Sequence, residues 1–448
     1  MAIIPTERRS LLSSQARVQA PFIKVTIGTY TFGIYSRTNA TVKDDAGFYT
    51  NAHIQYPNYV QSLQVTKING QVNKYTLNIQ YPVRQFDNPN FFEKVFSSVS
   101  KSRKIVFSYG DSSMPSYIYK DEEAIITDIQ TNFNFGSNGG GMTPVIGYTI
   151  SAVSGAALGK AGSFTFMNSG KKKPSDEIKR ILLDRKYGLA DLFTGVNSSN
   201  INKLIAGDDK AVALDSKQNI SALDYITYLA GCMLPAGSNQ SDTSKDIYIL
   251  TIHDDTTYDR VYTDREIIDG KEIIGPYLKV TRTSYANEQS DAYEIDIGYP
   301  SATIVTNFQV DNNENYSLYY DYNKKLNPEE YVRRLNDQGE WEDVYAPSFT
   351  SRNELFETRA EDISWYTKLT KFPVSATITI QGLLRPATLM TYVRINVIFP
   401  GGHKHITSGL YIVTKQVDTI DGNGYRTQLG LTKISGDNYL DIQNTYGN

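Results

Sequence analysis

Apolar and polar residues alternate most regularly between residues 374 and 434. Four segments of this block place apolar residues at every second position, which predicts pleated strands with one buried and one polar face. The last two segments are joined by Asp-Gly-Asn-Gly at 421–424, whose glycine and asparagine residues suit the positive φ of a tight hairpin. A looser version of the same block spans residues 72–153. The chain is therefore predicted to contain two related antiparallel β units.

The segment 409–420 departs from simple alternation, because both faces of the predicted strand carry apolar side chains. A sheet with one face in water lacks this pattern, so we expect the second face to contact another subunit. The apolar positions change face near Lys415 and Gln416. Such a change of face predicts a β-bulge in this strand.

Between the two β blocks, the period becomes that of a helix. Residues 155–170 are rich in Gly, Ala and Ser and precede three lysines, which predicts a linker. Ser175 and Ser221 each precede a helical pattern and are predicted N-caps, Ser221 as part of a capping box. Within the second β block, a short helix is predicted after Asn327-Pro328 and a longer one over 352–371.

These patterns predict a mainly β fold with α elements (α+β), with enough strands for two antiparallel β-barrels. The small helical domain lies between the barrels, and a helical insertion interrupts the second barrel. The expected divisions are an N-terminal arm (1–20), a first β-barrel (21–155), a linker and mainly helical domain (156–245), a second β-barrel in two parts (246–311 and 372–448) and a helical insertion (312–371).

Composition narrows the classes of partner. A formal net charge of −3 gives no basic surface for nucleic acid. The 33 tyrosines suit strands and protein contact surfaces. The one cysteine, Cys232, excludes an internal disulfide and a cysteine-based zinc site. Residues 1–20 lack the continuous apolar run of a secretory signal, and no segment has the apolar length to span a bilayer, so we expect no stable membrane insertion.

Histidines and carboxylates give the few candidates for catalysis or metal binding. His403 and His405 share a predicted strand face, but no third ligand is near them in sequence. His253-Asp254-Asp255 follows a strand and fits a solvated loop. Asp121-Glu122-Glu123 resembles half of a glycosidase carboxylate pair, but no partner carboxylate can be named. We therefore expect these three carboxylates to be solubilising surface groups.

Other conspicuous segments lack a chemical motif. The loop Gly136–Gly141 has no Lys-Ser/Thr and no helix pattern after it, as a phosphate-binding loop requires, and is predicted to be a hairpin tip. Lys171–Lys173 are predicted to be solvated, and the tyrosine-rich segment 316–323 fits a protein contact surface better than a carbohydrate platform. His53 stands alone. The sequence predicts no enzymatic activity and no catalytic, cofactor-binding or metal-binding residue.

Three stretches carry a family resemblance: residues 220–230, 298–313 and 408–433. Together with the order of barrel, helical domain and interrupted second barrel, they resemble the central baseplate hub proteins of tailed bacteriophages, particularly those with contractile tails. The resemblance covers most of the chain after residue 20. It depends on strand and turn patterns, of which the final hairpin is the most specific.

The resemblance implies two barrels per chain, each similar to a tail-tube subunit, and a homotrimer whose six barrels imitate one layer of the tube. Such a ring would hold the tail tube protein above and the spike protein below, with baseplate wedge proteins around it. DNA would pass through its channel without specific binding. The protein would belong to the tail baseplate of the virion, assembled in the host cytoplasm. Thr, Asn and Gln on several outward strand faces suit such a channel wall.

Two other functions are open at this point. One is the hub of a related contractile injection system. The other, from a different class, is a carbohydrate-binding or glycan-degrading β-rich tail protein. That function would need two facing carboxylates or an exposed row of aromatic rings in a groove.

Overall fold

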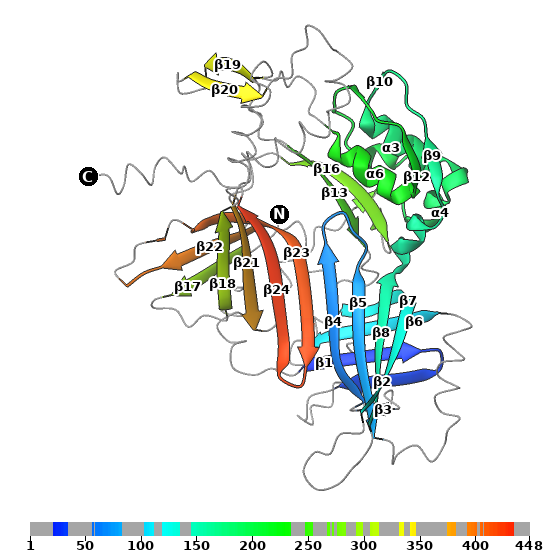
Figure 1. The fold of residues 1–448 in the computed structure, drawn as a ribbon, viewed down its shortest axis with the longest axis vertical. Helices are drawn as coiled ribbons and strands as arrows, with labels where there is room; N and C mark the ends of the chain where they lie inside the picture. Colours follow the sequence, from blue (N-terminus) through cyan, green and yellow to red (C-terminus); the bar gives the residue numbers. More distant parts are fainter. Residues whose placement is uncertain are drawn as a thin grey trace.

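Strands make up most of the described chain, and the helices gather in one unit (Figure 1). The computed structural model describes residues 21–34, 56–57, 59–82, 103–111, 119–134, 145–233, 247–253, 267–268, 271–272, 276–283, 293–298, 305–312, 331–335, 341–345, 374–381, 392–400, 404–405 and 407–433.

Fourteen strands belong to one sheet, which has two parts. The first β unit and the second β unit join where β4 lies beside β23 (Figure 1). The first β unit contains β1 (Pro21–Ile27), β2 (Tyr30–Ile34), β3 (Tyr56–Pro57), β4 (Val60–Ile68), β5 (Lys74–Pro82), β6 (Lys104–Asp111), β7 (Tyr119–Asn134) and β8 (Val145–Ser154). The second contains β17 (Tyr293–Gly298), β18 (Val305–Asn312), β21 (Val374–Gln381), β22 (Tyr392–Ile398), β23 (Gly409–Asp421) and β24 (Gly424–Lys433).

Each β unit has its own hydrophobic core, because side chains alternate between the two faces of its strands. In β5, for example, Tyr75, Leu77 and Ile79 are buried, while Thr76 and Asn78 lie on the other face. The predicted pair of closed barrels is not confirmed. Among the described strands the sheet is open, with β18 at one end and β3 at the other.

We call the two clusters the first core and the second core. The first core contains Ile23, Val25, Ile27, Phe32, Val60, Leu63, Val65, Tyr75, Leu77, Ile79, Ile105, Phe107, Tyr109, Tyr119, Ala124, Ile126, Tyr148, Ile150, Ala152, Ile420 and Tyr425. The second core contains Ile295, Ala376, Ile378, Ile380, Val393, Ile395, Tyr411, Val413, Leu429 and Leu431.

The two β units repeat one strand arrangement. The neighbours β4, β5, β8, β7 and β6 of the first unit match β18, β21, β24, β23 and β22 of the second. The residue register repeats as well, since Leu77 pairs with Ile150 and Ile378 with Leu429. The same correspondence holds along all four antiparallel ladders of this arrangement. We call two residues at matching positions counterparts. The repeat ends beyond β6 and β22, because β1 is antiparallel to β6 whereas β17 is parallel to β22.

Matching β-bulges mark this repeat. The β7–β8 ladder has one extra residue at Thr127, and the β23–β24 ladder has one at its counterpart Thr414. Each threonine hydroxyl donates to a carbonyl on the neighbouring strand, that of Ser151 at 3.1 Å and that of Gly430 at 3.2 Å. The bulge predicted near Lys415 is thus confirmed. Each bulge increases the local bend of its strand.

The second apolar face of β23 is also buried, but by this chain alone. Leu410, Ile412 and Val417 are exposed by 3%, 6% and 7% in the single chain. Their burial therefore requires no second subunit, contrary to the expectation from the sequence.

Residues 155–170, predicted to be a linker, belong to a folded helical unit. Its helical core includes the fully buried Ala156 and Phe166, whose ring stacks on Tyr225 with centroids 3.9 Å apart. Two strands predicted in the second barrel, β13 (Ile247–His253) and β16 (Tyr277–Thr283), pair with each other and add Leu250 and Val280 to this core. The unit's other elements are η5 (Gly155–Lys160), β9 (Phe164–Phe166), β10 (Lys171–Lys172), α3 (Pro174–Leu183), η6 (Arg185–Tyr187), α4 (Leu189–Leu192), α5 (Ile201–Leu204), β11 (Val212–Ala213), β12 (Lys217–Ile220) and α6 (Ala222–Gly231).

The two longer helices begin differently. Ser221 caps α6 as predicted, because its hydroxyl oxygen accepts the N–H of Asp224 at 3.0 Å. Ser175 is not the N-cap of α3, which begins at Pro174 after Lys173. Instead, the N–H of Ser175 donates to the buried carboxylate of Asp209 at 3.0 Å. A carboxylate from a distant loop thus satisfies an N–H that the first helical turn leaves open.

Beyond Asn312, which ends β18, the described part of the segment 312–371 is a strand pair, β19 (Tyr331–Leu335) with β20 (Trp341–Tyr345). The sequence pattern after Asn327-Pro328 predicted a short helix there. Tyr331 and Val332 are of residue types that favour strands, and pairing with β20 selects the strand over the predicted helix. The predicted helix over 352–371 lies outside the described residues. A further short pair is formed by β14 (Ile267–Ile268) and β15 (Lys271–Glu272).

Replacing Gly298 with alanine is expected to destabilise the second β unit by about 2–3 kcal/mol. An added Cβ would lie 2.3 Å from the carbonyl oxygen of Ile398, and the φ of Gly298 is +103°. Alanine at Gly155, where nothing lies within 4 Å of an added Cβ, is the matched control. Thermal unfolding midpoints of the two variants test this. Equal midpoints would contradict the close approach of β17 to β22.

Candidate functional site

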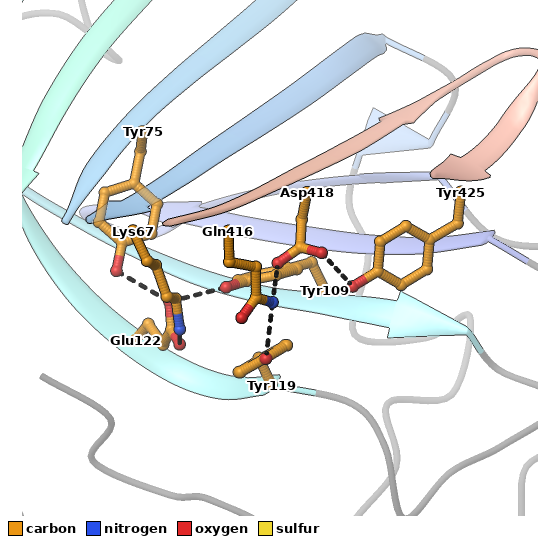
Figure 2. A network of polar contacts seen from close by, with 8 residues as sticks. All are labelled: Lys67, Tyr75, Tyr109, Tyr119, Glu122, Gln416, Asp418 and Tyr425. Atoms are coloured by element: carbon orange, nitrogen blue, oxygen red, sulfur yellow. Dashed lines mark hydrogen bonds and ion pairs between the residues drawn. The ribbon is translucent and has the colours of Figure 1, made fainter. Parts of the chain in front are cut away.

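A network of buried polar side chains lies where the two β units meet (Figure 2). Glu122 on β7 and Lys67 on β4 come from the first unit, and Asp418 on β23 comes from the second. Their exposed fractions are 2%, 4% and 1%. Each lies two residues from a buried apolar side chain of its own strand, Ala124, Val65 and Ile420 respectively, so the period that builds the cores also buries these charges.

Another bulge of β7, nearer its start than Thr127, places Tyr119 and Glu122 on the same inner face. Residues three apart on a regular strand point to opposite faces. Here the β6–β7 register shifts beside Tyr109, and Asp121 takes a positive φ of 52°. Asp121 is held by Ser108, whose hydroxyl oxygen accepts the Asp121 N–H at 3.0 Å. The bulge therefore turns both inner side chains toward β23.

Glu122 is the centre of the first half of the network. Its Oε1 lies 3.0 Å from Lys67 Nζ in a buried ion pair. Its Oε2 accepts hydrogen bonds from the hydroxyl groups of Tyr75 at 2.8 Å and Tyr109 at 3.2 Å. The carboxylate is thus bonded at both oxygens, which offsets the cost of removing it from water.

Asp418 is the centre of the second half. Its Oδ1 accepts from the hydroxyl groups of Thr427 at 2.7 Å and Tyr425 at 3.1 Å, and its Oδ2 from Gln416 Nε2 at 2.7 Å. Burial raises the pKa of Asp418, although the hydrogen bonds and the charge of Lys67 act in the opposite direction. The raised pKa means that this carboxyl group holds its proton more tightly when folded.

Tyr119 connects the two halves. Its hydroxyl oxygen accepts from Gln416 Nε2 at 3.2 Å. Its ring lies 4.2 Å from Lys67 Nζ and stacks on Tyr109 with centroids 4.7 Å apart. Burial and the neighbouring carboxylates raise the pKa of Tyr109 and of Tyr425 well above the ordinary value, so both remain hydroxyl donors.

The arrangement suits a structural joint. Its carboxylates are saturated with donors and shielded from water, whereas an acid or base catalyst must reach a substrate. One atom, Gln416 Oε1, has no hydrogen-bond partner among the described residues. The charged residues of this network occur once in the internal repeat, because their counterparts in the other β unit are uncharged. The counterparts of Glu122, Lys67 and Asp418 are Gly409, Asn312 and Thr131.

The outer face of the same sheet is mostly polar and uncharged. Amide and hydroxyl groups form a row across three strands, in which Asn78 donates to Ser62 at 2.8 Å and Thr149 donates to Asn78 at 2.9 Å. Other side chains on this face are Gln64, Thr66, Thr76, Gln130, Ser151, Thr419 and Gln428, with the charged residues Lys74, Asp128, Lys415, Asp421 and Arg426. Asp421 and Arg426 form an ion pair at 2.6 Å.

The predicted surface role of Asp121–Glu123 is wrong for Glu122. Asp121 and Glu123 are exposed, and Glu123 pairs with Lys104 at 2.5 Å. Alternation could have identified Glu122, because it is in phase with the buried Ala124 and Ile126. Asp418 is likewise in phase with the buried Ile420.

The other candidates are not brought together. His405 Nδ1 lies 2.8 Å from the hydroxyl oxygen of Thr407, and its ring meets that of Phe399 edge-on. Lys171 and Lys172 form β10, paired with β11. Within the described residues, no three His, Cys, Asp or Glu side chains form a metal-binding group, and no helix is long and apolar enough to cross a membrane. His53, His403, Asp254, Asp255, Gly136–Gly141 and 316–323 lie outside the described residues.

Comparisons with known proteins give distant likenesses. No protein-family model and no curated protein matches the sequence. The fold is similar to a tail protein from Neisseria meningitidis, at 11% identity over 92% of this chain and 96% of that one, with a TM-score of 0.44. It is similar to a prophage MuSo2 tail protein from Shewanella oneidensis, at 9% identity over 92% and 98%, with a TM-score of 0.45. A type VI secretion system component of E. coli matches at 9% identity over 86% and 76%, with a TM-score of 0.39. At these identities and TM-scores, the likenesses do not show what this chain does.

Proposed function

We propose that this chain is a structural tail protein, the trimeric central hub of a bacteriophage baseplate. The observation that carries the proposal is the internal repeat, in which two β units share strand order, register and bulges within one chain. Three such chains supply six similar units with three-fold symmetry. A ring of this kind can meet a six-fold tube on one side and a three-fold spike on the other.

In this proposal each β unit belongs to a tail-tube-like barrel, the first within residues 21–155 and the second within 246–311 and 372–448. Residues 156–245 form the helical domain, residues 1–20 an arm and residues 312–371 an insertion. The packing of β13 and β16 on the helical core supports moving these two strands to the helical domain.

The outer polar face supports a channel wall. DNA is held by proteins mainly through lysine and arginine contacts to phosphates. On this face amides and hydroxyls outnumber the cations Lys74, Lys415 and Arg426, and Arg426 is paired with Asp421, so the face offers little such attraction. DNA would pass this face during ejection without being bound.

The partners follow from the same geometry. The tail tube would sit on one side of the ring, the spike on the other, and wedge proteins around it, within the baseplate of the virion. The chain itself performs no reaction in this role, because its buried carboxylates serve the joint between the units.

Sedimentation velocity and electron microscopy of the purified full chain test this function. We expect particles with three times the chain mass of 50.3 kDa, and images of rings with six lobes around an open centre. A species that stays monomeric at the highest soluble concentration would refute the hub. A stable assembly whose mass is not a multiple of three chains would refute it as well.

A further inference from the structure

The β4–β23 pairing, which we call the seam, joins the two β units within one chain. Seven residue pairs form it antiparallel, from Lys415 opposite Ile68 to Asp421 opposite Ser62. At the seam, the β23–β24 hairpin places Ile420 and Tyr425 in the first core, although both belong to the second unit. The first core is thus completed by the end of a hairpin from outside its own unit.

The internal repeat gives every element of the seam a counterpart. The counterpart of β4 is β18, and the counterpart of the β23–β24 hairpin is the β7–β8 hairpin. Leu63 and Ile420, which face each other at the seam, correspond to Phe308 and Phe133. Tyr425, which lies opposite Ile420 in the β23–β24 hairpin, corresponds to Ile146.

Among the described residues, no hairpin end from another unit completes the second core. Within the described residues, β18 is the last strand of the sheet. The apolar residues that pack at the rim of the second core are only partly buried. These rim residues are Ile297, Val305, Phe308, Val310 and Val397.

The distal half of β7, residues 128–134, has the matching surface. Beyond the bulge at Thr127, its pairing partner among the described strands is β8 alone. Thr131 and Asn132 are exposed although they point to opposite faces, and Phe133 is 60% exposed. A large aromatic side chain with that much accessible surface is typical of a contact region.

We propose that β18 of one copy pairs antiparallel with the distal half of β7 of a second copy, in the register of the seam. This register places Phe308 opposite Phe133, Val310 opposite Thr131, and Asn312 opposite Ile129. Phe133 and Ile146 of the second copy then cover the rim of the second core, as Ile420 and Tyr425 cover the first core. The strand addition also satisfies backbone groups at both edges.

The charges permit this pairing. On the outer face, Gln309 lies opposite Asn132 and Asp311 opposite Gln130, so no like charges face each other directly. Asp128 and Asp311 each accept a hydrogen bond from a glutamine of their own strand, at 3.1 Å and 3.2 Å.

The contact uses two different surfaces of each copy, so it is heterologous. Each added copy leaves one such surface open until the rotation between copies closes a ring. In one respect this inference rests on the proposed function. The contacts from copy to copy end after three because the chains form a three-chain ring. Along that ring, seams within chains and contacts between chains would alternate around one continuous sheet.

Cysteine cross-linking tests the strand assignment. A Phe133→Cys chain is mixed with a Phe308→Cys chain and oxidised, since directly opposed residues of antiparallel strands lie within disulfide reach. We expect a two-chain band on a non-reducing gel. A chain with both changes is expected to give a ladder that ends at three chains. Mixing Phe133→Cys with Gln309→Cys is the matched negative control, because residue 309 points to the other face.

A positive control shows that the geometry admits the bond. Leu63→Cys with Ile420→Cys in one chain should form the equivalent disulfide across the seam, without changing the chain count. If this control closes and the Phe133/Phe308 pair does not, while sedimentation still gives three chains, the strand assignment is overturned and the hub stands. If the chain is also monomeric, both proposals fail.

Discussion

Replacing Lys67 with methionine should lower the free energy of unfolding by about 3–5 kcal/mol, the usual effect of removing one partner of a buried ion pair. Methionine keeps the length of the apolar stem but removes the ammonium partner of the Glu122 carboxylate, which still accepts from the hydroxyl groups of Tyr75 and Tyr109. The side chains of the pair are exposed by 5% and 3%, so water cannot replace the ammonium group. Thermal and denaturant unfolding of the purified variant measure the effect.

Two controls isolate the cause. Lys104→Met removes the partner of Glu123, but those side chains are exposed by 52% and 57%, so its effect should stay below about 1 kcal/mol. Adding Glu122→Gln to Lys67→Met removes the negative charge that has lost its ammonium partner and keeps an acceptor for Tyr75 and Tyr109, so part of the lost stability should return. Equal losses for Lys67→Met and Lys104→Met would contradict the buried pair.

Asp418→Ala should cost about 2–4 kcal/mol, because it leaves three buried donors without their acceptor. Asp418→Asn should cost less than about 1 kcal/mol. Its Oδ1 can still accept from Tyr425 and Thr427. Rotation of the Gln416 amide would bring its partnerless Oε1 toward the new Nδ2. Denaturant unfolding at neutral pH compares the two variants, and similar losses would argue against the hydrogen-bond network.

The same position should give a distinct pH dependence. Because burial raises the pKa of Asp418 above 3.8 in the folded chain, the folded state binds this proton more tightly than the unfolded state. Its contribution to stability is therefore complete below pH 3.8 and is lost as the pH rises through the raised value. Asp418→Asn lacks this proton, so its stability relative to the natural chain should increase over that pH window. Parallel pH profiles would refute the raised pKa.

Local pattern was enough to predict many of the strands, although not β19, and part of the repeat. The alternation in β21 and β22 fixed which side chains enter the second core, and the change of face near Lys415 predicted the bulge at Thr414. Ser221 was found because a cap and its helix lie within four residues. Each of these features depends on neighbours in sequence, which is the range over which periodicity carries information.

Features set by distant contacts were missed. The sequence pattern placed Gly155–Lys160 in a linker, because small residues suit both a loop and a tight approach. In the structure, an added Cβ at Gly159 would lie 3.1 Å from Leu189, so the small residue permits close packing. The phase of Glu122 with Ala124 and Ile126 marks it as inward-facing, but it was predicted at the surface because its partner Lys67 lies 55 residues away in the sequence. The seam is a further case, since β4 and β23 are far apart in the chain.

The length of β23 has a mechanical consequence. One strand, bulged at Thr414, contributes Tyr411 and Val413 to the second core and Ile420 to the first. A strand with backbone hydrogen bonds to neighbours on both sides resists bending in the plane of its sheet, so β23 makes a stiff connection across the junction. A load applied to one unit would therefore pass to the other through β23 and its backbone hydrogen bonds to β4 and β24.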